Sequence, residues 1–483
     1  MPDIRYVCLS DMHFGAETSL LTDLGAHGEA QPEQPSPVLR QLAKCLRKLI
    51  PDQDPGLKPA LIINGDVLEL ALAQDNTAAM AFQQFIDLTM LDGEPLFSSI
   101  LFNPGNHDHH LWETARETQF AEYVKGLAWE KSIEPAWHVS RIFKQHVESY
   151  FFNSLLKRHP RLKDLRINTA YPNFGLLDAD RQKGVVFHHG HFTEEIYLLV
   201  SILKTMLFPG SEVPMDIWGI EGENFAWIDF FWSTLGRSGD AGVAVDRVYE
   251  KLQDKEQVKK LLHNLAEGLT EKYGSSAWPA HLLEEGFIEL ACNALVNGMG
   301  SLERHNTDVP LSEKSEEGLK HYIEWPLKNH IVSELGFSPE KLTFVFGHTH
   351  KPWQGVKNYE GYREPVLVYN SGGWVVDHVE RDDKYGGAVI LVDDNLDVVS
   401  LSMYKEEENE ADYSVRVEEA LRPGENESQL YWKIKDRVDA RSEPWKAFSA
   451  TVASEVRLRA QYLKERIARQ SLPSTRQSPP PQA

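Results

Sequence analysis

The stretch IRYVCLSDMH, residues 4–13, decides the fold. Its apolar first part is typical of a buried strand, and that strand ends directly on the polar residues Asp11 and His13. The pattern returns along the chain, where further short apolar runs also end on polar residues: 60–63, 100–102, 184–187, 342–346 and 365–369. Buried strands separated by helical stretches predict a layered α/β fold. In open α/β sheets the ligand crevice lies at the carboxyl ends of the strands.

The polar residues at these strand ends share one chemical character, because they offer oxygen and nitrogen donors and no thiolate. They are Asp11, His13, Asp66, Asn106, His107, His189, His348 and His350. Seven of them, with His107 left over, make the donor set that two adjacent divalent ions need. An oxygen and nitrogen set favours Mn²⁺, Fe, Zn²⁺ or Mg²⁺ over a soft metal.

Each of these motifs alone has an ordinary explanation. Gly-Asp is usually a turn, Asp-x-His is common, and two histidines one residue apart can form a surface cluster. All of them, however, follow an expected strand, and they do so in one consistent order. We therefore interpret them as parts of a single site.

Composition narrows the class of protein. The chain has 483 residues, of which 42% are hydrophobic and 25% charged, as in a globular protein with a substantial core. This excludes a wholly disordered chain, collagen and a small disulfide scaffold. With 50 basic and 72 acidic residues the net charge is −22, which disfavours broad nucleic-acid binding.

The cysteines and the apolar stretches indicate a compartment. Cys8, Cys45 and Cys292 are far apart and odd in number, so we expect buried thiols in a reducing environment. The N-terminus runs into the first strand without a signal-peptide pattern. The longest apolar stretch, 196–208, is too short to span a bilayer. We expect a cytoplasmic protein without an integral membrane segment.

The ordered motifs resemble those of the calcineurin-like metallophosphoesterase superfamily. They are Asp11-Met12-His13, Gly65-Asp66, Gly105-Asn106-His107-Asp108, His189-Gly190 and Gly347-His348-Thr349-His350. Three longer stretches are similar to the branch that includes the UDP-2,3-diacylglucosamine pyrophosphohydrolases: 10–15, 65–69 and 370–374. The protein Ser/Thr phosphatases differ, because they have Glu where Asp108 stands and an Arg in the Gly-Asp motif.

The resemblance implies a four-layer α/β/β/α sandwich and a dinuclear metal site. One ion would be held by Asp11, His13, Asp66 and His350 and the other by Asp66, Asn106, His189 and His348. Mn²⁺ is the expected metal, with Fe, Zn²⁺ or Mg²⁺ as alternatives. Asp66 and a hydroxide that acts as the nucleophile would bridge the two ions. His107 would protonate the leaving oxygen or steady the phosphate, and Asp108 would orient the His107 ring.

Two further positions are candidates for contact with the substrate. In the run His188-His189-Gly190-His191, the family pattern selects His189 as the ligand, and strand alternation puts His188 on the opposite face. His191 is then a fallback ligand or a substrate contact. Asn370, at the end of the run 365–369, is a second candidate substrate contact.

The chain is expected to divide into a discontinuous core and three additions. The core covers 1–192 and 341–403, with a large, mainly helical insertion at 193–340. An acidic segment and a C-terminal helix occupy 404–470, and 471–483 is expected to be a disordered tail. The aromatic residues of the insertion fit a cap with an apolar groove, a face that dips into a membrane interface, or simply the core of a helical subdomain.

These features predict a hydrolase, acting as a phosphatase, phosphodiesterase or pyrophosphatase on a small phosphoester. The substrate would be lipid- or nucleotide-linked, because the insertion is rich in apolar residues. Two alternatives remain at this stage. One is a metal-dependent nuclease, which would need a basic groove, and the other is a catalytically silent scaffold with the same fold.

Overall fold

The computed structural model describes residues 3–50, 58–234 and 309–470, apart from Gln145, Arg181, Pro209 and Asp377. The middle of the expected insertion, 235–308, and the expected disordered tail, 471–483, lie outside the described residues. Within the described residues the chain is a mixed α/β structure, which confirms the predicted α/β class.

The larger sheet has the strand order β15-β14-β13-β1-β4-β5-β7-β6. Strands β1, β4, β5 and β7 run parallel to one another, whereas the other neighbours pair antiparallel. The bounds are β1 Ile4–Leu9, β4 Ala60–Asn64, β5 Ser99–Asn103, β6 Val147–Glu148, β7 Ile167–Thr169, β13 Gly386–Asp393, β14 Val398–Lys405 and β15 Arg416–Glu418.

The second sheet has the order β11-β12-β10-β9-β8, with β9, β10 and β12 parallel. Its strands are β8 Asn173–Leu177, β9 Lys183–His188, β10 Lys341–Phe346, β11 Trp353–Lys357 and β12 Val366–Asn370. A small hairpin of β2 (Thr22–Leu24) and β3 (Ala30–Pro35) follows the first strand. Strand β3 contains two prolines, Pro32 and Pro35. Proline lacks a backbone donor, but a two-stranded hairpin consists of edge strands that tolerate it.

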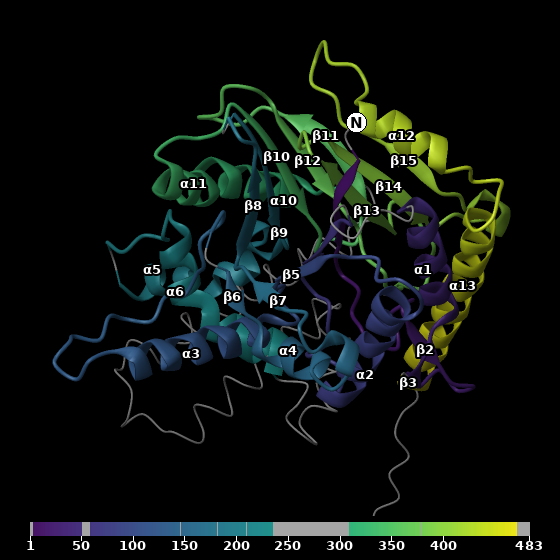
Figure 1. Cartoon of the computed structure of the whole chain (residues 1–483), viewed down its shortest axis with the longest axis horizontal. Coiled ribbons are helices and arrows are strands. Elements are labelled where there is room, and N and C mark those ends of the chain that lie inside the picture. The colour runs from purple at the N-terminus through teal and green to yellow at the C-terminus, as the bar shows by residue number, and fades with distance from the viewer. Residues whose placement is uncertain are drawn as a thin grey trace, which may run out of the picture.

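The helices occupy both outer sides of the sheets (Figure 1). The α-helices are α1 Pro37–Leu49, α2 Asp75–Ile86, α3 His109–Gly126, α4 Tyr150–Leu156, α5 Leu199–Leu207, α6 Ile217–Ile228, α10 Glu313–Tyr322, α11 Lys328–Leu335, α12 Gln429–Arg437 and α13 Trp445–Gln470. Short 3-10 and π segments are η2 Asp87–Leu91, η3 Pro160–Leu162, η4 His191–Thr193, η5 Glu195–Leu198, η6 Asp229–Thr234, η10 Ile323–Leu327 and η11 Glu410–Asp412. None of the helices that the structure describes is long and apolar enough to cross a membrane.

Local sequence explains where key helices begin. Ser36 caps α1, because its Oγ accepts the N–H of Leu39 at 3.0 Å, and Pro37 occupies the first helical position. The C-terminal helix expected within 404–470 is α13, which lies beside α1 (Figure 1). Of the three cysteines, Cys8 and Cys45 are buried thiols, as predicted, and Cys292 lies outside the described residues.

Alternation along the strands sends apolar side chains into three clusters. Val7 and Leu9 of β1 join a cluster with α1, α2 and α13, whereas Cys8 points to the other face. That face packs against the second sheet, where Val185 and Phe187 of β9 belong to the same cluster as Cys8. The opposite side of β9 presents Val186 to residues of α6, α10 and α11. The two faces of β1, and likewise those of β9, thus contribute to different apolar clusters.

Candidate metal centre

The carboxyl ends of the parallel strands of both sheets meet at one place. The side chain of Asn64, the last residue of β4, donates to the carbonyl of His188 at the end of β9. The backbone N–H of His348, after β10, donates to Asp11 Oδ1 at 2.9 Å. The residues predicted as metal ligands therefore come together from two sheets. All of them are at most 2% exposed: Asp11, His13, Asp66, Asn106, His189, His348 and His350.

Asp66 lies at the centre of this cluster. Its Oδ2 is 3.5 Å from His13 Nε2 and 3.3 Å from His189 Nε2. Three groups, each with ligand atoms within 4.8 Å of one another, could hold a metal ion: Asp11, His13 and His350; His13, Asp66 and His107; and Asp66, His189 and His348. Asp66 therefore lies between the His13 and the His189 sides of the cluster.

The second half of the cluster gathers around His189. Its Nε2 is 3.1 Å from Asn106 Oδ1 and 3.2 Å from His348 Nδ1. On the other side, His350 Nε2 lies 3.5 Å from Asp11 Oδ1. Two ligands bound to one ion at about 2.1 Å lie roughly 3–3.5 Å apart, so these separations suit a shared cation.

Backbone strain concentrates at the same residues. Asp11, His13, Asp66, His348 and His350 all have positive φ, between 44° and 70°. Such a conformation costs roughly 1–2 kcal/mol for a residue with a Cβ, and it persists only where neighbours enforce it. Backbone bonds do so here: Asp11 N–H donates to Gly65 O and His13 N–H to Asp66 O. Strain of this kind is typical of functional sites.

Two glycines permit the close approach of the loops. A Cβ on Gly65, which has a φ of +87°, would lie 2.2 Å from Nδ1 of His189. A Cβ on Gly347 would lie 2.1 Å from Oδ2 of Asp11. Any larger residue at either position would push a predicted ligand out of place, which explains why both motifs contain glycine.

The electrostatics of the cluster favour a cation. Burial alone would raise the pKa of Asp66, but His189 and His107 hold it well below its usual range. Burial alone would lower the pKa of His189, but Asp66 and Asp11 raise it to about 9. The carboxylates are therefore ionised and attract positive charge, which is supplied by protons or by metal ions.

The surroundings of His107 differ from the prediction. Its Nδ1 contacts Oε1 of Glu69 at 2.8 Å, and the other oxygen of Glu69 contacts Nδ1 of His13 at the same distance. Asp108 was expected to orient the His107 ring, and this was wrong. Its carboxylate instead accepts backbone N–H groups of Val67, Leu68 and Gly105.

This difference follows from the direction of the two loops. Asp108 is the N-cap of α3 and turns back toward the Asp66 loop, which it holds through backbone bonds. Burial and the neighbouring Asp66 raise the pKa of Asp108 to about 7. Glu69 lies three residues after Asp66, so it reaches both histidines from one side. A carboxylate at this spacing after Gly-Asp was the signal in the sequence that could have identified Glu69.

Glu194 is a second residue that sequence reasoning missed. Its Oε1 lies 2.6 Å from Nε2 of His348, which turns the Nδ1 of that ring toward His189. Glu194 is buried and lies near the start of the expected insertion. Because 154 residues separate it from His348, no local pattern could have paired them.

The two candidate substrate contacts have other partners. His191 Nε2 lies 3.1 Å from the hydroxyl of Tyr171, and its ring packs against Tyr197. It belongs to none of the possible metal groups found among the described residues. The amide nitrogen of Asn370 donates to Thr349 Oγ1, and its oxygen accepts Gly372 N–H. Asn370 thus braces the loop that carries His348 and His350.

The described start of the insertion reaches the cluster. Trp232 of η6 lies beside His107, with ring centroids 6.1 Å apart, and Tyr197 of η5 lies 5.3 Å from His348. The two aromatic rings also contact each other, at 5.2 Å. Ser233 donates to the carbonyl of Asn106 at 2.6 Å. Aromatic side chains thus adjoin the histidines from the insertion side.

A separate buried group comprises His109 and Glu113 of α3 and Glu221 of α6. His109 Nε2 lies 2.8 Å from Glu221 Oε1, and Tyr171 donates to the other oxygen of Glu221 at 3.0 Å. Glu113 forms an ion pair with Arg116. Burial alone would lower the pKa of His109, but Glu221 and Asp229 raise it to about 10. This group therefore acts as an ion pair that joins α6 to α3.

Comparison of the sequence with models of known protein families found no match. A search among curated proteins found no match either.

Proposed function

We propose that the chain is a dinuclear metal-dependent phosphoesterase of the calcineurin-like type. One observation supports this more than any other: Asp66 lies between two sets of donors, and all seven residues come from strand ends in the order that the resemblance requires. Apolar clusters lie between the two sheets and between each sheet and its neighbouring helices. This arrangement supports the four-layer sandwich that the same resemblance implies.

The residues present fit two divalent cations. Asp11 Oδ2 and His13 Nε2 are buried and make no hydrogen bond to any described group. Buried polar atoms without hydrogen bonds are costly, and metal coordination removes that cost. Asp11, His13, Asp66 and His350 would hold one ion, and Asp66, Asn106, His189 and His348 the other. The mixture of carboxylate, amide and imidazole donors suits Mn²⁺, and also Fe, Zn²⁺ or Mg²⁺.

When bound, two such ions supply Lewis-acid activation of water and neutralise charge on the phosphoryl oxygens. The protein's own residues do the rest. Glu69 holds the Nδ1 side of His107, so the Nε2 of that ring is the atom that donates a proton to the leaving oxygen or a hydrogen bond to the phosphate. Glu194 and Glu69 fix the ring positions of His348 and His13 in the same way.

The position of the insertion bears on the class of substrate. Trp232 adjoins His107, the proposed proton donor, and is therefore near the leaving group rather than the attacked face. Apolar aromatic surface at that point favours a leaving group with an acyl, aryl or nucleobase portion. The substrate would then be a small phosphomonoester, phosphodiester or pyrophosphate linked to a lipid or a nucleotide.

The test is hydrolysis of a panel of chromogenic mono- and diesters with added Mn²⁺, with metal analysis of the same preparation. The full-length protein should bind two ions per chain and hydrolyse at least one ester. His107→Ala should keep both ions and lower kcat by about 10²- to 10⁴-fold, the usual contribution of a general acid. His159→Ala, at the half-buried start of η3, is the matched control and should keep wild-type activity.

Three results would contradict the proposal. A protein that binds two ions without hydrolysing any ester would be a silent scaffold. Cleavage of single-stranded DNA with no action on small esters would make the chain a nuclease. Loss of metal in His107→Ala would turn His107 from a proton donor into a ligand.

A further inference from the structure

Ser19 braces the turn that carries Asp11 and His13. Ser19 Oγ donates to the carbonyl of Met12, the residue between the two proposed ligands, at 2.7 Å. Asp11 and His13 have φ values of 49° and 44°, which a residue with a Cβ adopts only under constraint. A hydrogen bond to the peptide between them therefore acts directly on the orientation of both side chains.

Ser19 is held in turn by the C-terminal helix. Arg459 of α13 donates from Nε to Ser19 O at 2.9 Å and from Nη2 to Thr22 O at 2.7 Å. Its third nitrogen, Nη1, pairs with Glu455 one turn earlier on the helix. Arg459 is only 2% exposed, and its bonds to Ser19 and Thr22 are buried.

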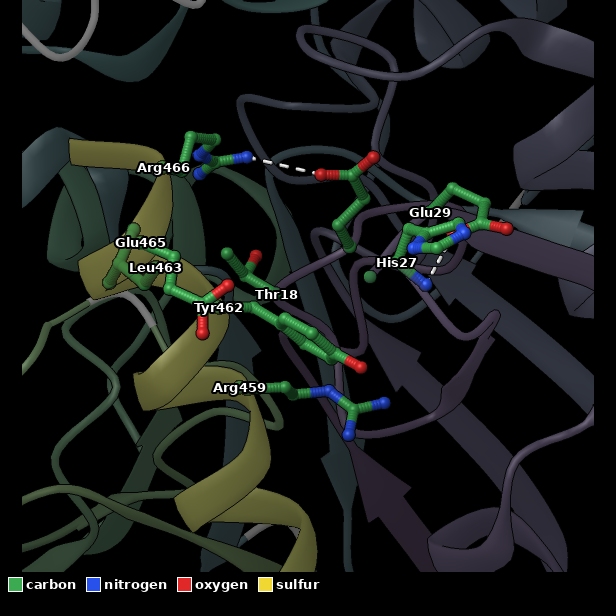
Figure 2. A pocket seen from close by; sticks show the side chains of 10 residues that line it. Thr18, His27, Glu29, Arg459, Tyr462, Leu463, Glu465 and Arg466 are labelled. Atoms are coloured by element: carbon green, nitrogen blue, oxygen red, sulfur yellow. Dashed lines mark hydrogen bonds and ion pairs between the residues drawn. The ribbon is translucent and has the colours of Figure 1, made fainter. Parts of the chain in front are cut away.

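Figure 2 shows how this helix faces the segment 17–29. Arg459, Tyr462 and Arg466 project from successive turns of α13 toward it. Tyr462 donates to Ala26 O at 3.3 Å, and Arg466 pairs with Glu17 at 3.2 Å. A cavity of about 360 Å³ lies between the two segments. Arg459 contacts Ser19, the residue whose hydroxyl donates to Met12 of the Asp11–His13 turn.

The chemistry at position 459 indicates a role beyond covering the core. Neighbouring positions on the buried face of α13 hold Phe448, Val452 and Val456, which pack against the larger sheet's cluster. A further apolar residue would extend that packing without the cost of removing a charged group from water. A guanidinium, however, can donate to two carbonyls at once in a fixed geometry. Arg459 makes such a pair of bonds to Ser19 and Thr22.

We propose that Arg459 is a positioning residue for the metal centre. Through Ser19 and Met12 it would set the geometry of Asp11 and His13, and so the affinity of the ion held by Asp11, His13 and His350. The inference rests on the proposed function, and it assigns part of that function to a helix more than 440 residues away along the chain. The ion held by Asn106, His189 and His348 is connected to this route only indirectly, through Asp66 and the bond from His348 N–H to Asp11.

Mn²⁺ titration by calorimetry of the full-length protein tests the proposal. Arg459→Met keeps much of the side-chain volume and removes the donors. One of two Mn²⁺ ions should bind about tenfold more weakly, at the low end of the usual effect of such supporting residues, while the other is weakened less. Arg459→Lys should recover part of the loss, because an ammonium reaches one carbonyl but not both. Arg457→Met, whose guanidinium forms an exposed ion pair with Glu410, should bind as wild type.

Ser19→Ala provides a second route that leaves α13 unchanged, should Arg459→Met fail to fold. It should weaken the same ion most. Adding Arg459→Met to Ser19→Ala should then give little further loss, because both act through one connection. The inference is overturned if either variant folds and binds both ions as tightly as wild type, or loses both equally. A wild-type protein that binds no Mn²⁺ would instead refute the proposed function itself.

Discussion

Glu69→Gln is the change that most sharply separates metal binding from proton transfer at the proposed site. Each Glu69 oxygen contacts one Nδ1, that of His13 or that of His107, at 2.8 Å. Glutamine has the same shape but no charge, and only one of its two groups accepts a hydrogen bond. One histidine therefore keeps a neutral acceptor, and the other faces an NH₂ group that cannot receive its proton.

The magnitude follows from these two bonds. A hydrogen bond to a charged group contributes about 1.5–3 kcal/mol and a neutral one about 0.5–1.5 kcal/mol. In the variant one hydrogen bond loses its charged acceptor and the other is almost entirely lost. The total loss is roughly 2–3 kcal/mol, or a factor of about 30 to 150 in the rate or the binding constant. If the NH₂ group faces His13, the affinity for Mn²⁺ should fall by this factor. If it faces His107, kcat should fall instead.

The assay is hydrolysis of a chromogenic ester over a range of Mn²⁺ concentrations, with bound metal measured in parallel. Glu406→Gln is the matched control, because Glu406 is also buried and contacts a histidine, His378, at 2.9 Å. It should retain wild-type activity. The reasoning is refuted if Glu69→Gln stays within twofold of wild type in both kcat and Mn²⁺ affinity.

Three further changes probe other parts of the structure. Asp66→Asn should lose bound metal and activity together. If this variant keeps two ions per chain and normal turnover, Asp66 is not shared by the two ions. Trp232→Ala should raise KM about tenfold for an ester with a bulky leaving group, and kcat for a minimal ester should stay within threefold of wild type. The control Trp432→Ala, at an exposed position, should change neither parameter. His109→Gln should reduce the free energy of unfolding by about 3 kcal/mol near pH 6. The pKa of His109 is raised to about 10 in the folded protein, so the stabilisation from its charge is complete below about pH 6.5 and is lost as the pH rises toward 10. Denaturant titrations of the wild type and the variant should therefore converge near pH 10. A difference that does not depend on pH would contradict the ion pair.

The positions of the proposed ligands could be predicted from sequence because each follows directly on an apolar strand. Strand ends of parallel sheets meet at one edge, so Asp11, Asp66 and His348 needed only local signals. Supporting residues give no such signal when they come from far along the chain. Glu194 reaches His348, and Arg459 reaches Ser19, through tertiary packing alone. The helix that carries Arg459 was predictable from its apolar spacing, whereas its role next to the site was not.

The edge of the larger sheet is a second feature that the sequence pattern did not predict. The expected core ended at residue 403, yet β15, Arg416–Glu418, pairs with β14 and extends the sheet beyond that point. A strand of three residues within an acidic segment has too few apolar positions for a period to be visible.

The expected insertion proves to have two different roles among its described residues. Helices α10 and α11 contribute Leu319 and Ile331 to the apolar cluster on the outer face of the second sheet, so they are part of the core in the physical sense. Tyr197 and Trp232 instead adjoin the histidines of the proposed metal centre. Removal of 193–340 as one block would expose buried apolar surface, at about 25 cal/mol per Å², and also remove the aromatic rings. Loss of activity would then have two explanations. A change confined to Trp232 leaves α10 and α11 in place, so only such a change can show whether the insertion selects the leaving group.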